Sequence, residues 1–178
     1  MARSVAPTAD LPCPACKKLH AGSAAAALKR LAETPAKVKA LVRGLDARGF
    51  ATRYGPGKWN VRQLVCHLRD CELMFGVRWR LILSEERPTL QSFDQDLWAD
   101  SANYAKQDAK AALATLVALR AGNLEMLKLA SGKALDRVGH HAQYGPITIA
   151  QMARHLSAHD ENHLGHLKLA RAAWSQRK

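Results

Sequence analysis

The sequence lacks several features that would place it in a specialised class of protein. No apolar run approaches the roughly 18–20 residues that a membrane-spanning helix needs, and the N-terminal segment has no apolar stretch typical of a secretory signal. Four cysteines in 178 residues are too few for a disulfide scaffold. Because apolar residues nevertheless make up 48% of the chain, a sizeable core can be buried. We therefore expect one folded domain, located in the cytoplasm, with reduced thiols.

Acidic residues are scarce, and the net charge of the chain is +12. The excess is uneven: residues 1–62 carry +9, residues 63–108 carry −3 and residues 109–178 carry +6. Such a balance suggests nucleic acid or an anionic small molecule as a partner. However, the basic residues occur singly or in pairs without a dense run, and aromatic residues are only 6% of the chain. A solvated basic surface is the commoner explanation, so nucleic-acid binding is kept only as an alternative.

Helical periodicity dominates the chain, and alternating β-type segments are missing. Pro35 can divide the first helical region into two pieces. Four long helices favour an all-α fold, a four-helix bundle over residues 23–178, with residues 1–22 as a short irregular tail. The expected helices cover residues 23–45, 60–87, 105–130 and 148–174.

Two of these helices begin with the same pattern. Asn60 with Gln63, and Thr148 with Gln151, form capping boxes, in which each side chain accepts a hydrogen bond from a backbone N–H of the other residue. A Tyr-Gly-Pro triplet precedes each box, at residues 54–56 and 144–146. The repetition suggests that the two helices are related by a pseudo-two-fold axis.

Five of the eight histidines lie on these two helices. At 100° per residue, His163 lies about 40° from His159, within the apolar stripe of the last helix. His67 lies about 60° from Leu64, at the edge of the apolar stripe of the facing helix. Buried imidazoles need partners, and one divalent cation can satisfy all three. The pattern therefore predicts a metal site made by His67, His159 and His163.

The remaining histidines are expected to have lesser roles, with His155 and His166 supporting the ligands or lying at the surface, and His140-His141 structural or exposed. A carboxylate near the ligands can orient an imidazole or carry a proton. Glu72 is the first candidate, because it lies about 80° from the inward-facing Leu64. Asp160 and Asp94 are weaker candidates.

The sequence resembles the DinB-like superfamily over about residues 31–172. The similarity is carried by the segments Gly57–Gln63, His67–Glu72, Arg87–Leu90, Phe93–Asp96, Tyr144–Pro146 and His155–Leu164. Members are four-helix bundles that include metal-dependent hydrolases and thiol-dependent transferases. In that family a His of the second helix and a His-x-x-x-His pair of the last helix hold the metal, which implies the same ligands: His67, His159 and His163.

The resemblance implies a small metalloenzyme in which a three-histidine site activates water or a thiol. Glu72 is the expected catalytic carboxylate, and zinc is the first expectation for the ion, with nickel, iron or manganese as alternatives. The expected partner is a small-molecule substrate, together with a low-molecular-weight thiol in the transferase case. A homodimer is also left open. The competing class is a non-catalytic binding protein with a structural metal site, or a basic protein associated with nucleic acid.

The tail contains a separate motif outside the family's domain. Cys13 and Cys16 form a C-x-x-C pair, and His20 follows them. The three could form part of a zinc site or a redox pair. Because a structural zinc site needs four ligands and this segment offers three, we expect an inert tail.

Overall fold

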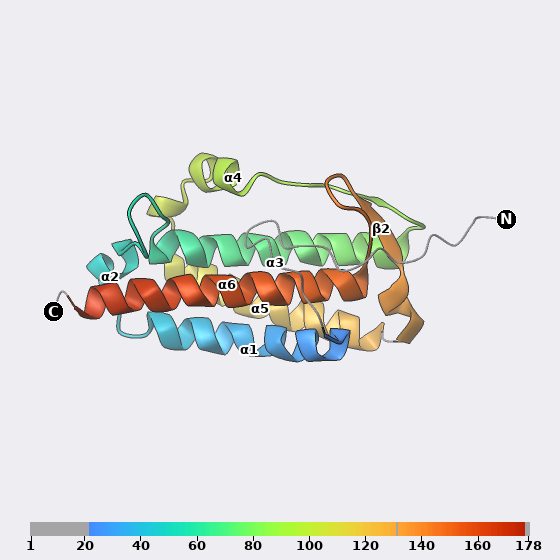
Figure 1. Ribbon diagram of the computed structural model, residues 1–178, viewed down its shortest axis with the longest axis horizontal. Helices are drawn as coiled ribbons and strands as arrows, with labels where there is room; N and C mark the ends of the chain where they lie inside the picture. Colours follow the sequence, from blue (N-terminus) through green and yellow to red (C-terminus); the bar gives the residue numbers. More distant parts are fainter. Residues whose placement is uncertain (1–21, 131, 177–178) are drawn as a thin grey trace.

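The fold is an all-α four-helix bundle with a small sheet at one end. A computed structural model describes residues 22–130 and 132–176. Four long helices form the bundle: α1 (Ala24–Val42), α3 (Val61–Ser84), α5 (Ala109–Leu129) and α6 (Ile149–Ser175). The packed pairs are α1 with α6, α6 with α3, α3 with α5, and α5 with α1 (Figure 1). The predicted fold class is therefore confirmed. The predicted irregular tail at residues 1–22 lies almost wholly outside the described residues.

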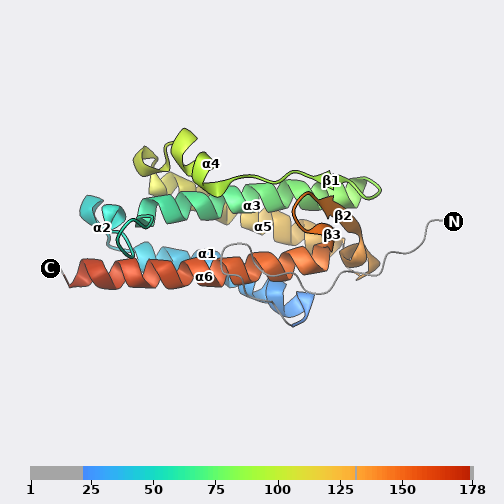
Figure 2. The same cartoon turned by 45° about the horizontal axis from the view of Figure 1, so that its top comes forward.

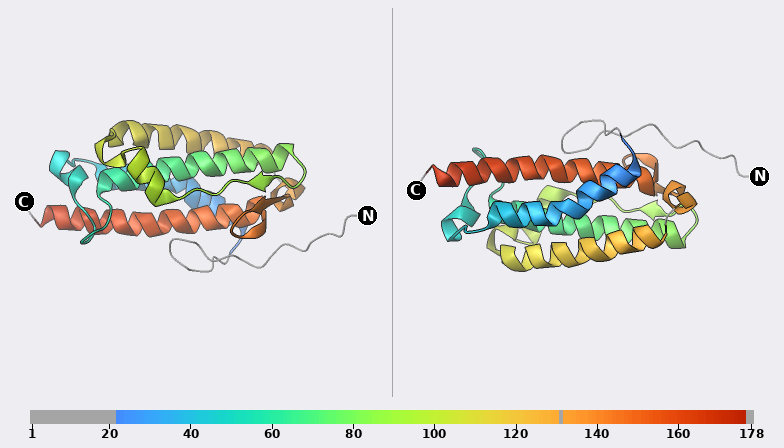
Figure 3. Two further views of the ribbon diagram at one scale, coloured as in Figure 1. Left: turned by 90° about the horizontal axis from the view of Figure 1, so that it is seen from above. Right: turned by 90° about the horizontal axis from the view of Figure 1, so that it is seen from below.

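Helix direction gives the bundle its topology. In Figure 1, α3 and α5 both run from the end near α2 (Ala47–Ala51) toward the small sheet, whereas α1 and α6 run the other way. Because α3 and α5 are parallel, their connection must return along the whole bundle. This crossover, residues 85–108, passes over α3 and contains β1 (Thr89–Leu90), α4 (Gln95–Ser101) and a 3-10 turn (Tyr104–Lys106) (Figures 2 and 3).

Both predicted capping boxes are present. Asn60 accepts a hydrogen bond from Gln63 N at 2.9 Å while Gln63 Oε1 accepts one from Asn60 N at 3.0 Å, and Thr148 with Gln151 repeats the arrangement before α6. These bonds satisfy N–H groups that a helix start otherwise leaves without partners. They fix the first turns of α3 and α6, the two helices that carry the histidine cluster.

Two expectations about local structure were wrong. Pro35 lies inside α1, which remains a single helix. The sequence also predicted no β-type segments, yet before α6 the strand β2 (Val138–His141) pairs antiparallel with β3 (Gly145–Thr148) and parallel with β1. Strands this short give little periodic signal, and β1 pairs only after the crossover has brought it beside β2.

The core is divided by a layer of buried polar side chains. One apolar cluster includes Leu64, Leu68 and Leu164, and the other includes Phe75, Trp79 and Leu156. On α6 the buried residues His159, Asp160 and His163 fall between Leu156 and Leu164 in the chain. Each fully buried Leu or Phe contributes about 1.5–3 kcal/mol to stability, so apolar burial on both sides can support the polar layer between them. Among the described residues, no helix combines the length and the hydropathy needed to cross a bilayer.

Candidate metal centre

Three imidazoles from two helices meet inside the bundle. The Nε2 atom of His159 lies 3.0 Å from Nε2 of His67 and 3.1 Å from Nε2 of His163. The exposed fractions of the three residues are 1% for His67, 7% for His159 and 5% for His163. The structure therefore brings together the three residues that the sequence predicted as ligands, across the contact between α3 and α6.

The donor set of this cluster suits a divalent cation. A ring nitrogen has one in-plane position, occupied either by a hydrogen or by a lone pair, so His159 Nε2 cannot form two good hydrogen bonds at once. A cation between the rings accepts all three lone pairs. In a tetrahedral zinc site with Zn–N bonds of about 2.0–2.1 Å, neighbouring ligand nitrogens lie about 3.3 Å apart. The two nitrogen–nitrogen distances are close to that value.

Burial keeps these rings in the form that binds metal. Desolvation lowers the pKa of His67 well below 6.5, and the neighbouring His159 lowers it further. Desolvation also lowers the pKa of His163 well below 6.5, and the nearby His159, His67 and His166 lower it further. Neutral imidazoles offer lone pairs, whereas imidazolium ions do not. Both rings are therefore ready to act as ligands at neutral pH.

Cys71 is a fourth donor that the sequence analysis missed. Its Sγ lies 3.4 Å from His67 Nε2 and 3.8 Å from His159 Nε2, and the residue is 3% exposed. His67, Cys71 and His159 form a group whose ligand atoms all lie within 4.8 Å of one another. The signal was present in the sequence, because Cys71 follows His67 by four residues, the spacing that identified His159 and His163.

A buried ionic network lies directly behind the cluster. Arg120 on α5 donates to Glu72 Oε2 at 2.6 Å, to Asp160 Oδ2 at 2.9 Å and to the carbonyl of Leu31 at 2.6 Å. Glu72 also accepts a hydrogen bond from Asn123 Nδ2 at 2.7 Å. Asn123 comes so close because Gly76 faces it: a Cβ at that position would lie 2.6 Å from Asn123 Nδ2. The network thus links α1, α3, α5 and α6 at the level of the histidines.

The two carboxylates of the network differ in how they relate to the histidines. Glu72, the predicted catalytic residue, is fully buried with both oxygens bonded to Arg120 and Asn123, and it is not part of the cavity wall. Asp160 Oδ1 lies 3.9 Å from His159 Nδ1. Burial raises the pKa of Glu72, whereas the pKa of Asp160 stays below its ordinary value because Arg120 and His159 outweigh the effect of burial. Asp160 therefore lies beside a predicted ligand, beyond hydrogen-bond distance of its ring, and a catalytic role for Glu72 stays a prediction.

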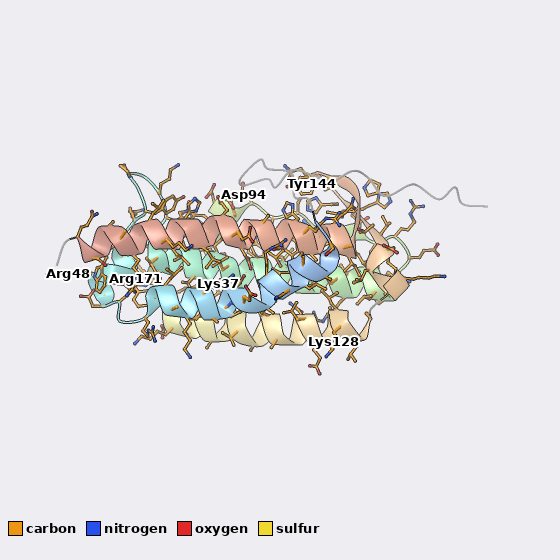
Figure 4. The ribbon with its side chains drawn as sticks, turned by 60° about the horizontal axis from the view of Figure 1, so that its bottom comes forward. Lys37, Arg48, Asp94, Lys128, Tyr144 and Arg171 are labelled. Atoms are coloured by element: carbon orange, nitrogen blue, oxygen red, sulfur yellow. The ribbon has the colours of Figure 1, made fainter. Side chains whose placement is uncertain are left out.

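A cavity of about 350 Å³ opens beside the cluster. Its wall comes from α3, α6, the crossover and the turn between β2 and β3, and Figure 4 shows Asp94 and Tyr144 on the same side of the bundle. The wall contains acidic, basic and aromatic side chains as well as apolar ones. The lining residues are His67, Cys71, Phe75, Arg78, Ser92, Phe93, Asp94, Gln95, Asp96, His141, Gln143, Tyr144, Ile147, Met152, His155 and His159.

The remaining predicted residues take different positions. His155 and His141 are buried and line the cavity, so His141 is not solvent-exposed. His166 Nδ1 lies 3.4 Å from His163 Nδ1, beside the cluster. Asp94 is exposed at the start of α4, where its Oδ1 accepts hydrogen bonds from backbone N–H groups. The predicted motif of Cys13, Cys16 and His20 lies outside the described residues.

Comparison with known proteins identifies similar chains. The sequence model that represents the DinB superfamily matches residues 30–167 of this chain. A protein of Oceanobacillus iheyensis, named "Putative metal-dependent hydrolase", is 30% identical over 147 residues, which span 80% of this chain and 82% of the relative. A Bacillus subtilis protein with the same descriptive name is 29% identical over 148 residues, covering 82% and 83% of the two chains.

A solved structure extends the comparison to three dimensions. It is that of the Bacillus subtilis protein YfiT, described as a probable metal-dependent hydrolase with an unusual four-helix bundle topology. The two folds superpose with a TM-score of 0.78 at 27% identity, covering 84% of this chain and 87% of the other. The parallel pair α3 and α5, joined by a long crossover, therefore belongs to a fold already seen in a solved structure.

Proposed function

The chain belongs to the DinB superfamily, and we propose that it is a metal-dependent hydrolase that acts on a small molecule in the cavity beside His67 and His159. His67, His159 and His163 hold the ion in this proposal. One observation carries it: His159 Nε2 lies within 3.1 Å of two further Nε2 atoms at the wall of a 350 Å³ cavity. The descriptive names of the two relatives refer to the same class of reaction.

A divalent ion held by imidazoles lowers the pKa of a bound water and polarises a substrate oxygen. Three imidazoles suit zinc first, and nickel, iron or manganese next. Asp160 Oδ1 lies 3.9 Å from His159 Nδ1, and a hydrogen bond between them in the metal-loaded protein would hold a proton on Nδ1 and direct the Nε2 lone pair toward the ion. Arg120 holds Asp160 in place from α5. Residues 92–96 of the crossover form one side of the cavity.

Metal analysis tests the centre. The untagged full-length protein is purified without chelators, beside His67→Ala and His159→Ala, and metals are quantified by inductively coupled plasma mass spectrometry. His140→Ala is the matched control, because His140 is outside the cluster and the cavity wall. We expect one divalent ion per chain in the wild type and the control, and loss of the ion in the other two variants. A wild-type protein that stays metal-free after incubation with zinc, nickel or manganese would contradict the proposal.

Activity assays then separate hydrolysis from thiol transfer. The metal-loaded protein is incubated with a panel of small esters, amides and activated electrophiles, with and without a low-molecular-weight thiol. The hydrolase proposal expects product without thiol and loss of turnover in His159→Ala. Product formed only when thiol is present would assign the chain to the transferases of its superfamily.

A further inference from the structure

A buried arginine forms part of the cavity wall, about two helical turns along α3 from Cys71. Arg78 is 5% exposed and lies on α3, seven residues after Cys71. It is the only Arg or Lys among the described residues that line this cavity. No step in the proposed hydrolysis uses it. The groups around Arg78 therefore indicate which class of ligand the cavity binds.

The guanidinium of Arg78 is only partly satisfied by the protein. Nε donates to the carbonyl of Gln91 at 3.0 Å, and Nη2 donates to the same oxygen. Within residues 22–130 and 132–176, Nη1 has no hydrogen-bond partner and no carboxylate pairs with Arg78. A guanidinium has five N–H donors, and buried charges are normally paired. Arg78 thus retains unused donors in the cavity wall.

Two aromatic rings lie beside the guanidinium. Its Cζ lies 5.5 Å from the centroid of the Phe75 ring and 5.8 Å from that of the Phe93 ring. Such contacts stabilise a cation through the ring faces and use none of its N–H donors. Phe75 and Phe93 also line the cavity, so the basic group is set in an apolar and aromatic surface.

Other charged groups of the wall do not neutralise Arg78. Asp94 and Asp96 are exposed at the start of α4, and Asp94 accepts hydrogen bonds from two backbone N–H groups there. Burial, and then the charge of Arg78, lower the pKa of His141 to about 4, so His141 is neutral at neutral pH. The buried part of the wall therefore carries one fixed positive charge.

We propose that Arg78 binds a carboxylate of the substrate, so that the protein acts on small carboxylic acids with an apolar or aromatic body. This proposal rests on the proposed function and specifies its substrate class. The planar fork of arginine matches two carboxylate oxygens. Cys71 and Arg78 are seven residues apart on α3, a rise of about 10 Å, so we expect the carboxylate and the reacting bond to be separated by roughly that distance or less once the length of the arginine side chain is spanned.

Arg78 also fastens the crossover to α3, and the chain offers a matched control for that structural role. Arg62 lies on the same helix and donates Nη1 to the carbonyl of Ala105, in the same crossover, at 2.8 Å. It is not part of the cavity wall. Arg62→Gln therefore removes one tether of the crossover and leaves the proposed carboxylate site intact.

Calorimetric titration of the zinc-loaded full chain tests the proposal. The probes are benzohydroxamate, which binds zinc, and its derivatives with a 4-carboxylate or a neutral 4-carboxamide. A charge-assisted hydrogen bond should make the carboxylate derivative bind about tenfold or more tightly than the carboxamide in the wild type and in Arg62→Gln. The ratio should fall toward one in Arg78→Gln, and Arg78→Lys should keep part of it. The Kd of unsubstituted benzohydroxamate should stay the same in all four proteins.

Other outcomes separate the two proposals. A ratio near one in the wild type, or a preference that survives in both Arg78 variants, overturns the carboxylate site and leaves the metal centre standing. If benzohydroxamate does not bind the wild type, the metal centre is in doubt. Arg78 is then judged by phenylacetate against phenylacetamide, a pair that needs no metal: equal binding rejects the site, and a preference for phenylacetate that is lost in Arg78→Gln and partly kept in Arg78→Lys supports it. Circular dichroism checks that each variant is folded.

Discussion

His67 and His159 are 92 residues apart in the chain, yet their Nε2 atoms lie 3.0 Å from each other. The contact joins α3 to α6 at the level where polar side chains divide the apolar core. It also makes folding and metal binding interdependent, because a ligand that binds only the folded chain stabilises it.

Metal removal should lower the stability of the wild type but not that of a variant that lacks one of the metal-ligating histidines. An ion present at 1,000 times its Kd adds about 4 kcal/mol to the free energy of unfolding. Treatment with a chelator should therefore lower the wild-type Tm, while His159→Ala should have a Tm that the chelator does not change. Thermal denaturation followed by circular dichroism measures both. A wild-type Tm indifferent to chelator and to added zinc would count against an ion in the polar layer.

Cys71 should bind the ion as a thiolate. In the cobalt-substituted wild type we expect a thiolate-to-cobalt charge-transfer band in the near ultraviolet, and in Cys71→Ser we expect the band to vanish while cobalt remains bound. With four protein ligands, catalysis would need the ion to take substrate or water as a fifth ligand, as some catalytic zinc sites do in the transition state. Cys66→Ser is the control, because Cys66 is equally buried on α3 but outside the donor group. A spectrum without the band would show that the site has histidine ligands alone.

Asp160→Asn should weaken both the fold and the metal site. Breaking a buried ion pair by removing one partner costs about 3–5 kcal/mol, and loss of a carboxylate that orients a ligand lowers metal affinity about 10–100-fold. Urea denaturation and competition with a metal indicator measure the two effects. Glu161→Gln is the control, because it changes the exposed neighbouring residue and should leave both the stability and the metal affinity unchanged. Unchanged metal affinity in Asp160→Asn would remove Asp160 from the supporting role assigned to it.

Glu72→Gln tests the predicted catalytic carboxylate against its observed contacts. Because Arg120 and Asn123 occupy both oxygens, we expect loss of stability with metal content unchanged. Turnover per folded, metal-loaded chain should fall only if Glu72 also takes part in proton transfer. Measuring kcat at a temperature where the variant is fully folded separates the two roles, and an unchanged kcat would leave Glu72 with a structural role alone.

The stability of the metal-free protein should fall in mild acid. The folded-state pKa values of His67 and His163 lie below the ordinary value of 6.5, so the unfolded chain binds more protons as the pH drops through that value. The free energy of unfolding should therefore be highest above pH 6.5 and decrease below it. Urea titrations from pH 8 to pH 5 measure the slope, which should be smaller in His67→Gln. A stability that rises in this interval would contradict neutral, buried imidazoles.

Local signals in the sequence determined the helices and most of the histidine cluster. The capping boxes at Asn60 and Thr148 depend on residues three positions apart, and the inward direction of His159 and His163 depends on helical periodicity alone. These features could be predicted because the interacting groups are neighbours on one helix. The same spacing would have identified Cys71 beside His67.

Tertiary structure decided everything that depends on which helix faces meet. Arg120 and Asn123 gave no signal on α5, yet they hold Glu72 and Asp160 after packing. The cavity, with Arg78 in its wall, exists only because the crossover returns over α3. Helix periodicity shows which face of a helix turns inward but not which partner lies opposite. That choice depends on the summed packing and electrostatic energy of residues far apart in the chain, and only the folded bundle makes it visible.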